Sequence, residues 1–374
     1  MYIHNRIESK TQFIQKLKEL DYILVFCILI LGIVSVATMY STDGGEVKFY
    51  TQSHSIKFVI FSALMLIMAF FNIRLWFSIS YFAYFILILM LIWTINFGIT
   101  VSGSQRWMNL YFINIQPSEL MKIAIILCLA KYFHRMRLEN VNSFYSVITS
   151  LIIIFVPMSL VIIQPDLGTS ILISVSGIIV LWFVGLNHKY FFYSFLISIV
   201  SFPFIISFLK PYQKLRILTF LNPDRDPLGA GYQIIQSKIA VGSGGLMGKG
   251  FLKGTQSYLE FLPEKHTDFI FTLFSEEFGF IGSLFLLLLY AIIIYRIILI
   301  GSISRSYFAK IFCYSFGSAI FVYITINMFM VLGMLPIVGS PLPIMSYGGS
   351  SMMATMIGFG IVLSAKIHNQ QSIA

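Results

Sequence analysis

The chain has 374 residues, of which 58% are hydrophobic and only 11% are charged. Soluble domains carry roughly a quarter of their residues as charged side chains. This composition therefore excludes a soluble protein and predicts an all-α, polytopic membrane protein with one integral-membrane domain over residues 1–374. The net charge of +10 is scattered over short polar segments, which is typical of membrane topology signals and not of a nucleic-acid-binding surface.

Apolar stretches recur along the whole chain, and a transmembrane helix needs about 20 such residues. The predicted spans are 21–41, 56–72, 76–97, 116–134, 145–163, 167–186, 189–208, 270–298, 307–334 and 346–367. The first span is too long for a cleaved signal peptide, and no small-residue cleavage site follows it. We therefore expect about ten transmembrane helices. The three cysteines, Cys27, Cys128 and Cys313, lie inside these runs, where packing is their expected role.

Basic residues in the short polar segments fall mainly on one side of this topology. That side carries Arg6, Lys10, Lys16, Lys18, Arg74, Lys131, Arg135, Arg137, Lys189, Arg296, Arg305, Lys310 and Lys366, whereas the other carries Lys48, Lys57 and Arg106. Because cytoplasmic loops are enriched in lysine and arginine, we expect both termini in the cytoplasm. The long polar segment at about 210–269, between the seventh and eighth spans, is then an extracytoplasmic loop.

The second half of this loop is rich in glycine and lysine. Residues 242–250 read Gly-Ser-Gly-Gly-Leu-Met-Gly-Lys-Gly. The backbone N–H groups of such a segment can cradle phosphate, although the spacing is not that of a Walker A motif, and a flexible connector is the alternative. Positive charge in this region favours an anionic substrate, so we expect Lys249, Lys265 and His266 to contribute to substrate binding.

Two charged residues lie near the start of the fourth predicted span. Pro117 suits the first turn of a helix, and Glu119 suits its positively polarised N-terminus, so Glu119 alone needs no functional explanation. Lys122 does need one, because a lysine inside a membrane helix is costly and usually faces a cavity or a partner. The i, i+3 spacing places both side chains on one face, where they can pair. We therefore predict a functional ion pair.

An acidic residue stands directly before the eighth predicted span. Asp268 follows the polar residues 264–267 and precedes Phe269-Ile270-Phe271. A carboxylate at this depth is partly desolvated, which raises its pKa toward the range that is useful to a general base. The alternative is that Asp268 caps the N-terminus of the following helix, a common role for aspartate.

Several stretches together resemble the SEDS family (shape, elongation, division and sporulation). They are Ser102-Gly103 with Arg106-Trp107, Gln116-Pro-Ser-Glu119 with Lys122, Gln164-Pro-Asp-Leu-Gly168, residues 262–271 and residues 341–351. They follow the family's order and span nearly the whole chain, which makes the resemblance specific. The glycine-rich segment, with Gly254-Thr-Gln256 after it, resembles the elongation branch of the family more than its division branch.

The resemblance implies a function. The family polymerises lipid II, the lipid-linked disaccharide precursor, into peptidoglycan glycan strands outside the bacterial cytoplasmic membrane. It works with a class B penicillin-binding transpeptidase and, in elongation, with other membrane proteins of the elongation complex. By motif match, Asp268, Glu119 and Lys122 correspond to the family's essential residues, and Arg106 and Asp166 to positions that shape the substrate cavity.

The residue types suit this chemistry. The acceptor is a sugar 4-hydroxyl, and a carboxylate that takes its proton contributes roughly 10²–10⁴ in rate. The diphosphate leaving group needs positive charge. We assign Asp268 as general base, Lys122 and Arg106 to the diphosphate, and Glu119 to orienting Lys122 or holding a metal. One in-line displacement inverts the anomeric carbon. The one cofactor we consider is a divalent cation, Mg²⁺ or Mn²⁺, bound through oxygen atoms; no organic cofactor is expected.

Two other functions remain open alternatives. A lipid II flippase would also have many spans, intramembrane charges and helices broken by glycine and proline. However, the sequence has no inverted hydropathy repeat, and a transporter needs no large outer loop that ends in a poised acid. A scaffold that only positions a partner enzyme would leave Glu119, Lys122 and Asp268 without a role.

Overall fold

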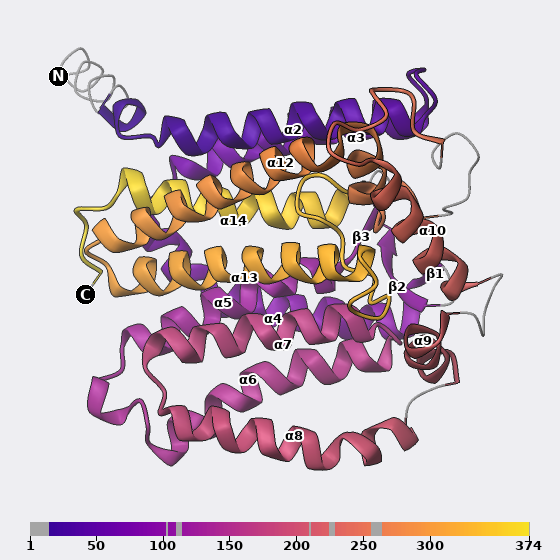
Figure 1. Ribbon diagram of the computed structural model, residues 1–374. Coiled ribbons are helices and arrows are strands. Elements are labelled where there is room, and N and C mark those ends of the chain that lie inside the picture. The colour runs from indigo at the N-terminus through magenta and orange to yellow at the C-terminus, as the bar shows by residue number, and fades with distance from the viewer. Residues whose placement is uncertain are drawn as a thin grey trace.

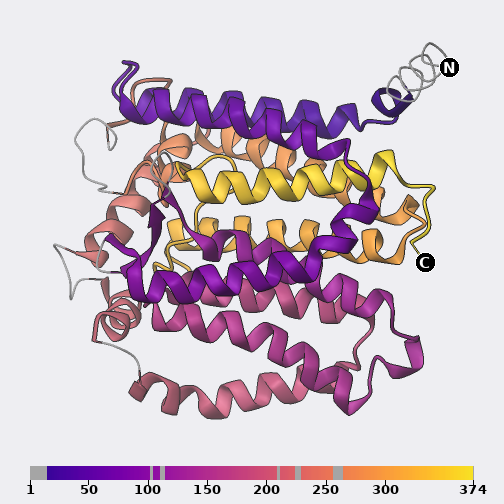
Figure 2. The same ribbon diagram turned by 180° about the vertical axis from the view of Figure 1, so that it is seen from behind.

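The protein is a bundle of long helices lying side by side (Figures 1 and 2). The computed structural model describes residues 15–101, 104–109, 114–208, 211–223, 229–255 and 264–373. Its long helices are α2 (Tyr22–Thr42), α3 (Phe49–Ala69), α4 (Ile73–Phe97), α5 (Pro117–His134), α6 (Phe144–Ile163), α7 (Leu167–Val184), α8 (His188–Phe208), α12 (Ile270–Ile303), α13 (Tyr307–Val331) and α14 (Gly349–Ile367). Each corresponds to one predicted span. In the described part of the chain, eight are long and apolar enough to cross a membrane, and α5 and α8 run alongside them, so the polytopic all-α membrane fold is confirmed.

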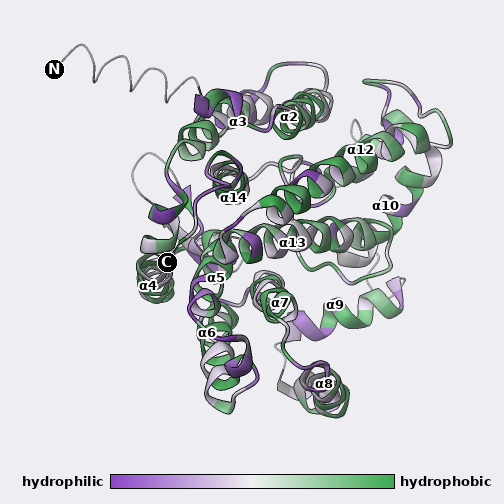
Figure 3. Ribbon diagram, turned by 90° about the vertical axis from the view of Figure 1, so that its left-hand side faces the viewer, coloured by the Kyte–Doolittle hydropathy of each residue, from purple (hydrophilic) through white to green (hydrophobic). Residues whose placement is uncertain are grey.

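Helix α5 is the centre of the bundle. It packs against α4, α6, α7, α13 and α14, which surround it in the end-on view of Figure 3. Nearly all of its residues are buried, including Glu119, Lys122 and Lys131. A helix that is buried on every face is normally apolar all round, and this one carries three charges that must find partners inside the protein.

The two ends of the bundle differ. Helix α2 begins and α14 ends at the same end (Figure 1), where Asp21 caps α2 by accepting from the Leu24 N–H at 2.9 Å and pairs with Arg296 of α12 at 2.5 Å. The opposite end carries a small antiparallel sheet and two more helices: β1 (Ile99–Val101), β2 (Ser104–Asn109), β3 (Asn114–Ile115), α9 (Pro211–Leu221) and α10 (Ala230–Ser243).

The sheet and α9 were not predicted from the sequence. The strands are only two to six residues long, too short for a clear alternating pattern. Helix α3 begins at Phe49, well before the predicted start at residue 56. Its polar first turn is stabilised by Asp43, whose carboxylate accepts from the Thr51 N–H at 2.8 Å and from the Thr51 hydroxyl at 2.6 Å.

Helix α12 is broken at Gly279, where φ is 65° and ψ is −160°, and the glycine-rich segment 242–250 fills the break. The hydrogen bonds that join them are Lys249 N–H to Glu276 O (3.0 Å), Gly250 N–H to Glu277 O (2.9 Å), Phe280 N–H to Gly245 O (2.9 Å) and Ile281 N–H to Leu246 O (3.1 Å). At Gly248 a Cβ would lie 2.1 Å from the Glu277 carbonyl oxygen, so only glycine fits. The segment therefore supplies hydrogen-bond partners to the backbone groups that the break in α12 leaves free. Neither the phosphate-cradle nor the flexible-connector interpretation anticipated this role.

Candidate active site

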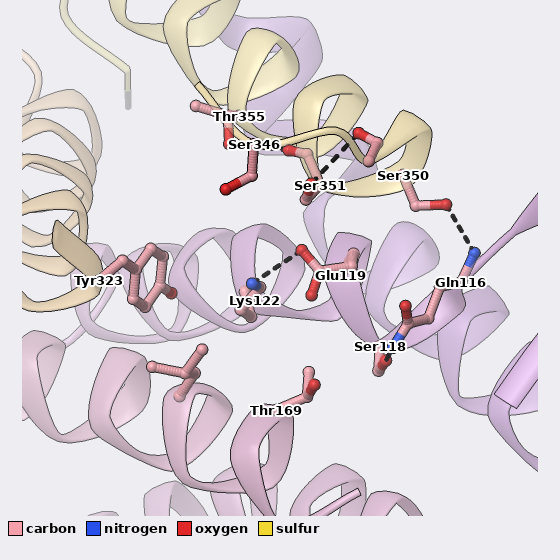
Figure 4. Close-up of polar contacts among 12 residues, drawn as sticks. Gln116, Ser118, Glu119, Lys122, Thr169, Tyr323, Ser346, Ser350, Ser351 and Thr355 are labelled. Atoms are coloured by element: carbon pink, nitrogen blue, oxygen red, sulfur yellow. Dashed lines mark hydrogen bonds and ion pairs between the residues drawn. The ribbon is translucent and has the colours of Figure 1, made fainter. Parts of the chain in front are cut away.

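The predicted ion pair is present on α5. Lys122 Nζ lies 2.8 Å from Glu119 Oε2, and the two side chains are only 7% and 5% exposed. Figure 4 shows them side by side, with Tyr323 of α13 next to Lys122 and with Ser351 and Thr355 of α14 opposite. The Lys122 ammonium lies 4.9 Å from the centre of the Tyr323 ring, which adds a cation–π contact to the ion pair. Tyr323 does not stand out in the sequence, since an aromatic residue in an apolar span carries no distinctive signal.

The ion pair faces a small cavity. Its walls are Glu119, Lys122, Ile123, Phe316, Ile320, Tyr323, Pro341, Pro343, Ser351, Ala354 and Thr355, and its volume is about 20 Å³. A cavity of that size holds a water molecule. A sugar ring or a diphosphate enters only if the walls contributed by α13 and α14 move apart.

Asp166 organises the neighbouring part of the site. It caps α7 by accepting from the Thr169 N–H at 3.1 Å and from the Thr169 hydroxyl at 2.9 Å. The same carboxylate accepts from Arg106 Nη1 of β2 at 2.8 Å and from Gln116 Nε2 at 3.2 Å. It thus ties the small sheet to the starts of α5 and α7. Arg106 and Asp166, which the sequence analysis predicted as substrate-binding residues, are therefore paired with each other.

The structure does not support the helix-cap interpretation of Asp268. The N-cap of α12 is Phe269, and no side chain caps that helix end. Among the described residues, none donates a hydrogen bond to the Asp268 carboxylate. Asp268 is partly exposed, and its Oδ2 lies beside Gly339, where an added Cβ would be 3.6 Å from it.

Burial raises the pKa of Asp268 to about 7, and the nearby negative charges of Glu264 and Asp166 act in the same direction. The guanidinium groups of Arg106 and Arg216 oppose this shift. A carboxyl group that titrates near neutral pH is well matched to general-base catalysis. The pKa direction expected from the sequence therefore agrees with the structure.

Arg216 is a residue that the sequence analysis missed. It lies on α9, and its Nη1 donates to the Ile337 carbonyl at 3.2 Å, two residues before the glycine against which Asp268 packs. Its charge acts on the Asp268 carboxyl. The one signal in the sequence was Pro211, which suits the first turn of a short helix and could have indicated that Arg216 lies on one.

The remaining predicted binding residues lie elsewhere. Lys249 Nζ lies 2.6 Å from the buried Glu276 carboxylate, so its charge is already neutralised within the protein. The His266 ring stacks on Tyr50 with 3.9 Å between the centroids, and its Nδ1 lies 3.0 Å from the Thr42 hydroxyl. Lys265 is buried in the same turn. Substrate binding by these three residues stays a prediction.

In the described part of the chain, no group of three or more His, Cys, Asp or Glu side chains comes together to hold a metal ion. The described residues therefore do not form a complete metal site by themselves. A hard cation bound chiefly by substrate phosphate needs only one or two protein carboxylates, and the Mg²⁺ or Mn²⁺ considered from the sequence stays a prediction of that kind.

The fold and the site together define a multi-pass membrane protein with charged residues gathered at one end of the bundle and a buried ion pair on its central helix. The chain belongs to the FtsW/RodA/SpoVE family of cell cycle proteins, whose model matches residues 17–371. This is the SEDS family, so the resemblance carried by the sequence motifs is confirmed.

Curated relatives match along nearly their whole length. The chain is 40% identical over 356 residues to the peptidoglycan glycosyltransferase MrdB (RodA) of Escherichia coli K12, covering 94% of each chain. It is 33% identical over 357 residues to the probable peptidoglycan glycosyltransferase FtsW of Wigglesworthia glossinidia brevipalpis, covering 92% of each. The higher identity to the elongation protein agrees with the expected branch.

Solved structures share the fold. A chain from a structure described as coordinating polymerization and crosslinking in a peptidoglycan synthase complex superposes with a TM-score of 0.78 at 28% identity, covering 93% of this chain and 97% of that one. The rod shape determining protein RodA of Thermus thermophilus superposes with a TM-score of 0.71 at 22% identity, covering 94% and 98%.

Proposed function

We propose that this protein is the glycosyltransferase that polymerises lipid II into glycan strands during cell-wall elongation, with Asp268 as its general base. Its curated relatives are named peptidoglycan glycosyltransferases, and it matches them over more than nine-tenths of its length. The chain is accordingly an enzyme of that class. The substrate, the orientation and the residue roles below are our proposal.

The observation that carries the catalytic assignment is the state of the Asp268 carboxylate. Within the described residues it is neither a helix cap nor a hydrogen-bond acceptor, it is partly exposed, and its pKa is raised to about 7. A partly exposed carboxylate that accepts no hydrogen bond from the described residues, and whose pKa lies near neutral, is suited to accept a proton from a bound substrate.

The reaction proceeds as one displacement. The 4-hydroxyl oxygen of the acceptor sugar forms a bond to the anomeric carbon of the donor, and the bond from that carbon to the diphosphate oxygen breaks. The hydroxyl proton passes to Asp268, and the lipid diphosphate leaves with the electron pair. A single in-line attack inverts the anomeric carbon, as in inverting glycosidases.

Arginine side chains supply the positive charge for the leaving group. Arg106 keeps its Nε buried without a partner among the described residues, which is costly unless a ligand accepts from it. Arg216 of α9 donates to the Ile337 carbonyl, and its charge acts on the Asp268 carboxyl. Guanidinium groups bind phosphate through paired N–H donors. Lys122, held by Glu119, is the inner charge of the site and meets the substrate only when the small cavity opens.

The chain is a multi-pass membrane protein. We propose that both termini are cytoplasmic and that the end with β1–β3, α9 and α10 faces outward, which places Asp268 outside the cytoplasm. This orientation follows from the basic residues at the other end of the bundle. The partner is a class B penicillin-binding transpeptidase. The likeness to a chain from a peptidoglycan synthase complex supports that partner.

The test is a polymerisation assay. Purified protein in detergent is mixed with lipid II, a divalent cation and the matching transpeptidase, and the products are sized on a gel. A detergent micelle does not separate two aqueous compartments, so polymer formed in detergent cannot result from transport. Wild-type protein should form polymer, and Asp268→Asn should be slower by roughly 10² or more. Near wild-type synthesis by Asp268→Asn would refute the base assignment, and wild-type protein without polymerase activity would favour the flippase.

A further inference from the structure

The backbone that carries Asp268 is held from one side by a single segment. The carbonyl groups of three consecutive residues, His266, Thr267 and Asp268, each accept a hydrogen bond. Their donors are the Tyr347 N–H at 2.8 Å, the Ser346 hydroxyl at 2.6 Å and Asn327 Nδ2 at 3.0 Å, respectively. All three donors come from the end of α13 or from the stretch that joins it to α14. The turn before α12 is therefore docked on that stretch.

Asn327 is the member of this set that reaches Asp268 itself. Its side chain is fully buried on α13. The same Nδ2 also donates to the Ser340 carbonyl at 2.7 Å, next to Gly339, against which the Asp268 carboxylate packs. One amide group thus fixes both the backbone of Asp268 and the wall that its carboxylate touches.

The amide nitrogen of Asn327 serves two backbone carbonyls, but the same side chain also carries a cost. Among the described residues, Asn327 Oδ1 is buried without a partner, so the side chain leaves a polar atom unsatisfied inside the protein. The stretch between α13 and α14 also holds Ile344 at a φ of 67°, which is a strained conformation for a β-branched residue. Strained backbone and unsatisfied polar atoms persist where the surrounding structure fixes them, commonly at functional sites.

We propose that Asn327 is the positioning residue of Asp268, and that its amide holds the backbone of the general base against residues 339–340 and so fixes the direction in which the carboxylate points. The inference rests on the proposed role of Asp268 and adds a residue on a different helix. Small displacements of a catalytic group are expensive: a shift of about 1 Å can cost roughly 10²-fold in rate.

The test replaces the amide with a side chain of similar volume. Asn327→Leu removes the donor and the unsatisfied oxygen together, and Ser315→Ala, a buried polar residue on the same helix, is the matched control. For each variant with its transpeptidase partner, kcat, KM for lipid II, the acid limb of the pH–rate profile and the thermal unfolding temperature are measured. Asn327→Leu should lower kcat about 10–100-fold, change KM less than about threefold, and move the acid limb to lower pH because the freed carboxylate gains water. Ser315→Ala should match wild type.

The outcomes separate the two proposals. A kcat for Asn327→Leu within about twofold of wild type, with an unmoved acid limb, would overturn the positioning role. A loss of activity that follows the unfolding temperature and leaves the acid limb unchanged would also overturn it, in favour of a structural role. Should Asn327→Leu fail to fold, Asn327→Ser applies the same criteria with a smaller loss, because a hydroxyl can serve only one of the two carbonyls. Full activity of Asp268→Asn in the same assay would instead refute the proposed function.

Discussion

Lys122 and Glu119 are joined by a 2.8 Å ion pair in which both side chains are more than nine-tenths buried. Taking two charges out of water is costly, and their mutual attraction only offsets that cost. Removing one partner leaves an uncompensated charge inside the protein, and this typically destabilises a fold by about 3–5 kcal/mol. The pair is therefore weak evidence for stability and stronger evidence for a role in the cavity that it faces.

We predict that Lys122→Met and Glu119→Gln each abolish polymerisation and lower the thermal unfolding temperature. The double variant should unfold at a higher temperature than either single variant and should still be inactive, because no charge is left unpaired and none is left to act. Lys131→Met, on the same helix but outside the cavity, is the control and should retain activity. Wild-type levels of polymerisation by either single variant would show that the ion pair has only a structural role.

The pH dependence of the reaction should report Asp268. Its pKa lies at about 7, and only the ionised form can accept a proton, so the rate should fall as the pH drops below 7. Glu264→Gln removes a negative charge that raises this pKa, so the acid limb should move to lower pH. Arg106→Gln removes a positive charge that lowers it, so the acid limb should move to higher pH. Each shift should be about half a pH unit.

These opposite shifts are compared at saturating lipid II, so that changes in substrate binding do not enter. Shifts of the same sign in both variants would mean that another group sets the acid limb.

The stability of the folded protein depends on the Asp268 carboxyl group as well. The folded protein binds this proton more tightly than an unfolded chain, whose ordinary value is 3.8, so the stabilisation is present at low pH and is lost as the pH rises through 7.

Arg216 should contribute to substrate binding. Arg216→Gln removes a guanidinium group close to Asp268, and we expect KM for lipid II to rise about tenfold, the scale of one charge-assisted hydrogen bond. Lys214→Gln is the matched control, because Lys214 lies on the same helix but donates to the Ser207 carbonyl at 3.0 Å. Its KM should stay near the wild-type value. Equal effects of the two substitutions would point to general electrostatic attraction and not to a specific contact.

The orientation can be tested with an impermeant thiol reagent on intact spheroplasts. Met247→Cys places a thiol at a residue that is 78% exposed in the glycine-rich segment, and it should react without lysis. Glu139→Cys lies at the other end of the bundle and should react only after lysis. The native cysteines are buried, so background labelling should be low. The reverse pattern would invert the topology and remove Asp268 from the outer face.

The sequence was informative wherever hydrocarbon imposes a simple rule. Long apolar runs predicted the spans, since a backbone in lipid must satisfy its own hydrogen bonds within a helix. The Glu119–Lys122 pair followed from the cost of a lysine inside a span and from the geometry of one helical turn. Asp268 stood out because it directly precedes an apolar helix, although its sequence context alone left the helix-cap interpretation open.

Contacts between distant segments required the tertiary structure. Tyr323, Arg216 and Asn327 reach the site from α13 and α9, and nothing in their local sequence specifies which residues they meet. Lys249 pairs with Glu276, 27 positions away, so a lysine that suggested phosphate binding is already neutralised. The glycine-rich segment bonds to a break in α12 that only the packed helices reveal. Periodicity and composition act along the chain, whereas the pairing of charges and the satisfaction of buried polar groups depend on which helices pack together in space.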